Sequence, residues 1–170
     1  LAASAYAGDL PEIRMVEGGF GESDDPFTNL LLSMWQETLG AEIIVEYVDP
    51  MDLTRAAKEA NGHIVSYGWC ADYPDPENFL DLLFHTDSDF NVANYSNAQV
   101  DALLEQARTE LDPAARIALY QQVERLLLED YATIPLQSSQ SHVLVSSRIK
   151  GYIFSGLGAR SLDSLSLSGE

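Results

Sequence analysis

The sequence predicts an α/β domain: a mixed sheet that begins with parallel strands and carries helices on its faces. The first seventy residues alternate short runs rich in β-branched residues with segments of helical periodicity, in the order β-α-β-α-β. Strands joined through helices in this way lie parallel, with right-handed crossovers. The chain has 170 residues, 46% of them hydrophobic, which is enough for one domain with a substantial core. We therefore expect residues 1–170 to form a single domain.

Three strands and two helices account for this first part. We expect strands at Glu12–Val16, Ile43–Val48 and His63–Tyr67, where apolar and β-branched side chains gather. The pairs Asp25-Pro26 and Asp49-Pro50 each place a capping acceptor before a proline, which is typical of a helix start. The apolar residues of the first helix recur at the spacing of one buried face: Phe27, Leu30, Leu31, Met34, Trp35 and Leu39.

The second half of the chain predicts helices followed by two short strands. Asn97 and Asp112 can each cap a helix, and Arg116 is placed to pair with a nearby acid. The strands expected after these helices are Ile134–Gln137 and His142–Val145. The apolar residues expected to face inward are Val100, Leu103, Leu104, Ala107 and Leu111 in the first helix and Leu119, Tyr120, Val123, Leu126 and Leu127 in the second.

The loop after the third strand concentrates aromatic rings, carboxylates and prolines. Pro74 and Pro76 restrict its backbone, and Asp75 is expected to cap a helix whose first residue is Pro76. Asp72 has no such structural role. It lies beside Trp69 with no lysine or arginine nearby in sequence, which makes it a candidate receptor for a cation or an amine. The alternative is an ordinary turn aspartate whose side chain accepts backbone N–H groups.

The order of the elements predicts where a ligand would bind. In open parallel sheets, ligands bind beyond the carboxyl ends of the strands. The loops that leave those ends include the glycine-rich Glu17–Asp25 and the segment Gly68–Asp75, so both are expected on one rim. Phe20, in the glycine-rich loop, is a weaker candidate for contact with a ligand. A phosphate is not expected there, because the loop lacks the lysine of a P-loop and carries several carboxylates.

Several motifs resemble one family, the solute-binding proteins of peptide-type ABC importers, which include oligopeptide-, dipeptide- and nickel-binding proteins. The resemblance is most specific in the pattern Gly68-Trp69-x-Ala71-Asp72-Tyr73-Pro74-Asp75-Pro76-x-Asn78-Phe79-Leu80. Further matches follow in the same order: Asn94–Asn97, Asp101-x-Leu103-Leu104, Arg116-x-x-x-Tyr120, Asp130–Leu136 and Gly151-Tyr152. The resemblance runs from about Ala7 to Tyr152, which is nearly the whole chain.

This resemblance implies the C-terminal lobe of a two-lobed protein with the type II periplasmic-binding fold. Such a protein works outside the cytoplasm, in the periplasm or as a lipoprotein on the outer face of the membrane. A signal sequence would then lie upstream of Leu1. The implied partners are the missing N-terminal lobe and the permease of an ABC importer, and no cofactor is implied. The tail 153–170 would belong with the missing lobe, or would pack on its own domain or on a neighbouring molecule.

The resemblance also assigns residues to ligand binding. The aspartate at the position of Asp72 would hold the α-ammonium of a peptide, or of a related amine-bearing solute, for ATP-driven import. Trp69 and Tyr67 would line the cleft, although either can instead be an ordinary core aromatic. Some members of the family carry nickel complexes, so the solute stays open. The loop backbone would pair with the peptide main chain at Gly68, Cys70 and Ala71.

Composition argues against several other functions. The net charge of −18, from 27 acidic and 9 basic residues, disfavours a nucleic-acid partner. Cys70 is the single cysteine, so no internal disulfide can form, and we expect a buried, inert thiol. The histidines lack zinc-binding spacing and no G-x-S-x-G elbow presents a nucleophile, so an enzyme is not expected. Two alternatives stay open: a hydrolase that uses carboxylates of the rim, and an interaction domain whose helices after Asn97 contact a partner protein.

Overall fold

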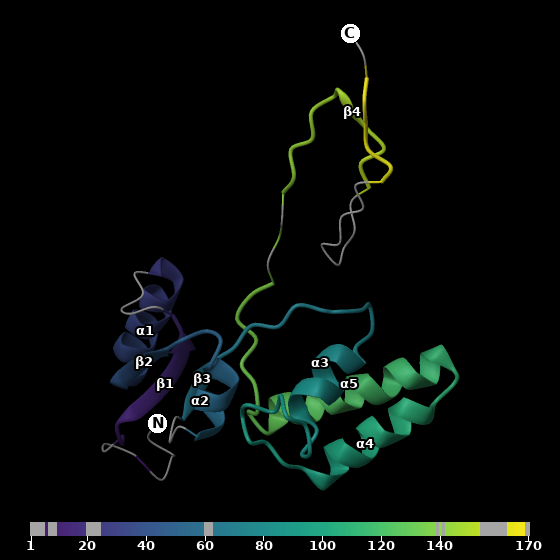
Figure 1. Cartoon of the computed structure of the whole chain (residues 1–170). Coiled ribbons are helices and arrows are strands. Elements are labelled where there is room, and N and C mark those ends of the chain that lie inside the picture. Colours follow the sequence, from purple (N-terminus) through teal and green to yellow (C-terminus); the bar gives the residue numbers. More distant parts are fainter. Residues whose placement is uncertain are drawn as a thin grey trace.

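The computed structural model describes residues 6, 10–19, 25–59, 63–138, 140, 142–153 and 163–168. They form a parallel sheet with two helices, a group of three helices, and an extended segment that ends in a two-stranded ribbon (Figure 1). None of the helices in these ranges is long and apolar enough to cross a membrane. The elements are β1 Ile13–Gly18, α1 Pro26–Leu39, β2 Ile43–Val48, α2 Leu53–Glu59, β3 Ile64–Ser66, α3 Glu77–Phe84, α4 Ala98–Thr109, α5 Pro113–Glu129, β4 Ile149–Lys150 and β5 Ser166–Leu167.

The predicted β-α-β-α-β start is confirmed. β1 is the central strand of a three-stranded sheet of order β2-β1-β3, and both pairings are parallel. Met15 lies opposite Val45 on one side and Ile64 on the other, and its side chain is 2% exposed. A mixed sheet is not seen in the described ranges, because the antiparallel pair β4–β5 is separate from the parallel strands.

α3, α4 and α5 build the largest apolar core. The predicted caps of α4 and α5 are confirmed: Asn97 accepts the backbone N–H of Gln99 at 2.9 Å, and Asp112 accepts that of Ala114 at 3.0 Å. Leu80 and Phe84 of α3 pack against this core. The residues buried in it are Val100, Leu104, Ala107, Leu119, Tyr120, Val123 and Leu127.

Leu111 was expected in this core and is instead 93% exposed. α4 ends at Thr109, and Glu110 is already extended, with φ −72° and ψ 123°. Asp112 is extended as well, as expected for the residue before Pro113. The helix that would have brought Leu111 inward therefore ends two residues before it.

A bidentate ion pair fastens α3 to α4. Arg108 donates to the two carboxylate oxygens of Asp81 at 2.7 Å each, and the Asp81 side chain is only 6% exposed. A carboxylate so deeply buried is stable only when a cation and its hydrogen bonds compensate for the lost water. The pair therefore fixes the position of the helix that follows the candidate site.

The apolar face of α1 is less buried than its periodicity predicts. Leu31 and Trp35 are half-buried, but Phe27, Leu30 and Met34 are 38%, 60% and 55% exposed, and Leu39 at the end is also exposed. Helical periodicity shows that one face is apolar, whereas burial depends on what lies opposite that face. Nothing in the described part of the chain covers this face fully.

The two strands expected after α5 do not form. Residues 133–138 and 142–146 belong to no strand, and the chain runs away from the helices towards β4 (Figure 1). Ile134, Leu136 and Leu144 are exposed. β-branched residues favour an extended backbone, but a strand also needs a partner edge, and none of the described strands offers one here. In the tail, Leu167 is 71% exposed.

The packing of α4 on α5 predicts a large difference between two leucines. Leu104→Ala, at a position that is 0% exposed, is expected to lower the free energy of unfolding by about 2–5 kcal/mol. Leu111→Ala, at a position 93% exposed, is expected to change it by no more than about 0.5 kcal/mol. Urea unfolding followed by circular dichroism measures both, and similar losses would contradict this core.

Candidate functional site

The loop that leaves β3 carries most of the predicted site. β3 ends at Ser66 and α3 begins at Glu77, so the loop starts at the carboxyl end of the parallel sheet and crosses to the helices (Figure 1). That end is where ligands of open parallel sheets bind. Asp72 is exposed in this loop, whereas Trp69 is half-buried.

The side chain of Asp72 is not folded back on its own turn. Its backbone N–H donates to Asn78 Oδ1 at 2.9 Å. In the described part of the chain, its carboxylate has one hydrogen-bond contact, from Asn78 Nδ2 to Oδ2 at 3.4 Å, which is long. A turn-forming aspartate would accept a backbone N–H, as Asp75 does from Glu77 at 2.9 Å. Asp72 thus presents a carboxylate with most of its acceptor capacity unused.

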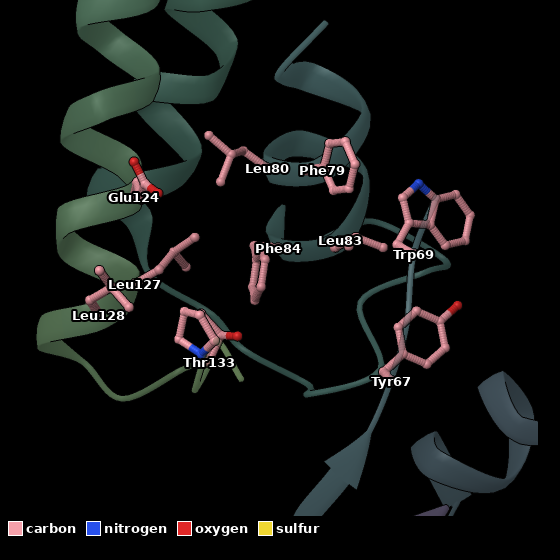
Figure 2. Close-up of a pocket in the computed structure, with 11 residues that line it drawn as sticks. Tyr67, Trp69, Phe79, Leu80, Leu83, Phe84, Glu124, Leu127, Leu128 and Thr133 are labelled. Carbon is pink, nitrogen blue, oxygen red and sulfur yellow. The ribbon is translucent and has the colours of Figure 1, made fainter. Parts of the chain in front are cut away.

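Aromatic rings gather around Trp69, whose indole shares the acceptor Asn78 Oδ1 with the backbone N–H of Asp72. Trp69 stacks on Tyr67 with ring centroids 6.3 Å apart, and meets Phe90 edge to face at 5.3 Å. Both Tyr67 and Trp69 border an open groove of about 240 Å³ between the loop, α3 and α5 (Figure 2). Most of its lining is apolar: Tyr67, Trp69, Phe79, Leu80, Leu83, Phe84, Glu124, Leu127, Leu128, Thr133 and Pro135.

The backbone positions proposed to pair with a ligand are mostly accessible. Gly68 and Cys70 are exposed and Ala71 is half-buried. The prediction of a buried thiol at Cys70 is therefore wrong. The loop between β3 and α3 runs over the surface, and Cys70 is exposed there between the half-buried Trp69 and Ala71. Phe20 lies outside the described residues.

Asp75 connects the loop to the helices. Its Oδ1 caps α3 by accepting the N–H of Glu77, and α3 starts at Glu77, one residue after the predicted Pro76. Arg116 donates to the two oxygens of Asp75 at 2.5 and 3.0 Å, which confirms the expectation that Arg116 pairs with an acid. The guanidinium of Arg116 holds the pKa of Asp75 below its ordinary value, against the opposing effect of burial.

Asn78 is the site residue that sequence reasoning missed. It is 1% exposed, and its Oδ1 accepts both the Trp69 indole N–H at 3.1 Å and the Asp72 backbone N–H. The sequence shows it only as one position of the motif around Asp72. The available signal was an amide in the first turn of a helix, directly before the apolar Phe79 and Leu80.

Comparison with known proteins identifies relatives of this chain. No protein-family model matches it. The periplasmic murein peptide-binding protein MppA of Escherichia coli is 27% identical over 152 residues, which cover 89% of this chain and 28% of MppA. The probable deoxycholate-binding periplasmic protein YgiS of the same organism is 32% identical over 122 residues, covering 72% of this chain and 23% of YgiS. The solved structure of OppA from Burkholderia pseudomallei matches with a TM-score of 0.73 and 28% identity, over 93% of this chain and 31% of that chain.

Several of these relatives are periplasmic peptide-binding proteins, among them MppA and OppA of Escherichia coli, and one solved structure is of an ABC transporter-associated periplasmic binding protein in complex with a peptide. The named relatives are binding proteins, which agrees with the expectation that this chain is not an enzyme. The match to their structures also confirms the predicted α/β fold of the type II periplasmic-binding proteins. The chain spans about a quarter of the length of the curated relatives it matches.

Two of the three histidines of this chain, His63 and His85, accept backbone N–H groups. His63 Nδ1 accepts the backbone N–H of Arg14 at 3.1 Å. His85 is buried, its Nδ1 accepts the N–H of Asp87, and its Nε2 lies 3.8 Å from a carboxylate oxygen of Glu105. Within the described ranges, no three His, Cys, Asp or Glu side chains are grouped so that they could hold a metal ion.

The ion pair of Asp75 predicts a pH-dependent stability. Because Arg116 lowers the folded-state pKa of Asp75, the stabilisation is complete above the unfolded value, about 3.9, and is lost as pH falls through the lower folded value. Asp75→Asn is expected to lower the free energy of unfolding by about 1.5 kcal/mol at pH 7. This value is at the low end for hydrogen bonds to charged groups, because the side chains of Arg116 and Asp75 are each roughly a quarter exposed.

Urea unfolding between pH 2 and pH 7 measures this difference. The wild type and Asp75→Asn are expected to converge at the acid end, where the carboxyl of the wild type is protonated. Asp89→Asn, at an exposed aspartate in the next loop, is the control and should follow the wild type throughout. A difference that persists unchanged at the acid end would show that the charge of Asp75 is not what matters.

Proposed function

We propose that this chain forms the part of an extracytoplasmic solute-binding protein that receives the free α-amine of a peptide for uptake by an ABC importer. The observation that carries the proposal is the exposed carboxylate of Asp72, at the carboxyl end of a parallel sheet, with one long contact to its own chain. The homology to periplasmic peptide-binding proteins supports it.

The chemistry of the site suits an ammonium group. An ammonium donates three hydrogen bonds and carries a full positive charge, and an exposed carboxylate offers acceptors of opposite charge. Such a charge-assisted bond contributes about 1.5–3 kcal/mol when the cleft around it excludes water. The net charge of −18 would also attract cationic groups over longer distances.

The neighbouring residues would complete the recognition of a peptide. Trp69 and Tyr67 would form an aromatic wall, with the apolar groove beside them available to an apolar part of the solute. The exposed backbone at Gly68 and Cys70, with Ala71, would pair with the peptide main chain. The opposing wall would come from an N-terminal lobe that closes over the ligand through a hinge, and the closed protein would then dock on a permease.

Asp72→Asn tests the receptor role, because asparagine keeps the shape of the side chain and removes its charge. In the complete polypeptide, this change is expected to weaken binding of trialanine by roughly 10- to 100-fold and to spare N-acetyl-trialanine. Isothermal titration calorimetry with both peptides measures the effect, and Asp89→Asn is the matched control. Equal losses for the two peptides would refute the assignment.

The residues 1–170 alone are expected to bind trialanine too weakly for calorimetry at micromolar concentrations. One lobe retains Asp72 and the aromatic wall but buries much less ligand surface than two lobes that close on it. A dissociation constant in the micromolar range or tighter for these residues alone would contradict this expectation, and with it the need for a second lobe.

A further inference from the structure

Asn78 is a buried amide that hydrogen-bonds to Trp69 and Asp72 of the candidate receptor and also interacts with the side chain of Tyr73. It lies in the first turn of α3, and its side chain is 1% exposed. A buried amide is tolerated only when its polar atoms find partners. Those partners include the indole of Trp69 and both the backbone and the carboxylate of Asp72.

A single atom, Asn78 Oδ1, holds the ring and the carboxylate-bearing residue together. It accepts the Trp69 Nε1–H at 3.1 Å and the Asp72 backbone N–H at 2.9 Å. Both of those groups can only donate, so only the amide oxygen can face them, and this fixes the orientation of the amide. Nδ2 is left on the side of the carboxylate, 3.4 Å from Asp72 Oδ2.

Helix capping does not explain Asn78. The N-terminal N–H of α3 is accepted by Asp75, whereas the side chain of Asn78 reaches back to residues six and nine positions earlier in the loop. Apolar packing does not explain it either, because a leucine of similar size would leave two N–H donors without an acceptor.

We propose that Asn78 is a positioning residue, which holds Trp69 and Asp72 in a fixed relation so that an incoming ammonium meets the carboxylate and the ring together. This inference rests on the proposed function of Asp72. The Nδ2 contact orients the carboxylate without neutralising it, since it is uncharged and long. Because the loop is already ordered, the free energy of ligand binding does not include a cost for ordering it.

The test compares two buried asparagines in the complete polypeptide. Asn78→Ala removes the shared acceptor. Asn91→Ala is the matched control, because Asn91 is 3% exposed and its amide bonds to the backbone of His85 and Tyr95, not to Trp69 or Asp72. For each variant, calorimetry gives the ratio of the dissociation constants of N-acetyl-trialanine and trialanine. This ratio reports recognition of the amine and is insensitive to a uniform loss of folded protein.

Asn78→Ala is expected to lower this ratio about tenfold, and Asn91→Ala to leave it unchanged. Asn78→Asp retains an oxygen for the two N–H donors but replaces Nδ2, 3.4 Å from Asp72 Oδ2, by a second carboxylate oxygen, so it serves only for the indole measurement. The indole ¹⁵N–¹H resonance of Trp69, assigned by its loss in Trp69→Phe, is expected to move and exchange faster with water in Asn78→Ala. In Asn78→Asp it should stay close to that of the wild type.

Three results would overturn the inference. If Asp72→Asn collapses the ratio and Asn78→Ala does not, Asn78 positions nothing, although the proposed function stands. If Asn91→Ala lowers the ratio as much as Asn78→Ala, the loss is not specific to the acceptor that Trp69 and Asp72 share. If neither Asp72→Asn nor Asn78→Ala changes the ratio, both the proposed function and the role of Asn78 are wrong.

Discussion

The site depends on the ion pair between Asp75 and Arg116, because it joins the loop of the sheet to the core of the helices. Arg116 stands in the first turn of α5, and it also donates to the backbone carbonyl of Ala107 at the end of α4 and to the hydroxyl of Tyr120. One guanidinium therefore fastens three segments at once, which suits its fixed fork of donors. Asn78 attaches the loop to α3 a second time, by accepting the Trp69 indole N–H and the Asp72 backbone N–H.

These two attachments explain how a surface loop can present an exposed carboxylate in a defined place. Binding residues are often found on loops that a rigid scaffold positions. Asp75 and Asn78 take up the structural tasks of the loop, namely helix capping, ion pairing and satisfaction of the indole N–H. Asp72 is left without such a task, although it lies three residues from Asp75 and has the same side chain. The structural role of Asp75 and the proposed binding role of Asp72 therefore depend on which partners the fold places beside each side chain.

The sequence predicted the features that are decided within a few residues. Asn97 and Asp112 cap helices as expected, and the parallel start of the sheet followed from the alternation of its elements. The face of α1 and the strand expected at Ile134–Gln137 were mispredicted because burial and strand pairing depend on distant neighbours, and no described surface covers them fully. Leu111 was mispredicted for a local reason, because α4 ends before it.

By itself, the sequence determined the type and order of the elements in the first half and singled out the loop around Asp72. Capping, proline restriction and periodicity act over one or two turns, so they can be read without a structure. Only the tertiary structure decided that Asp75 pairs with Arg116, 41 residues away, and that Asn78 is the shared acceptor of Trp69 and Asp72. Such contacts depend on how segments that are distant in sequence meet in space. The chemistry of a side chain determines what it can bind, whereas the fold determines which partner lies next to it.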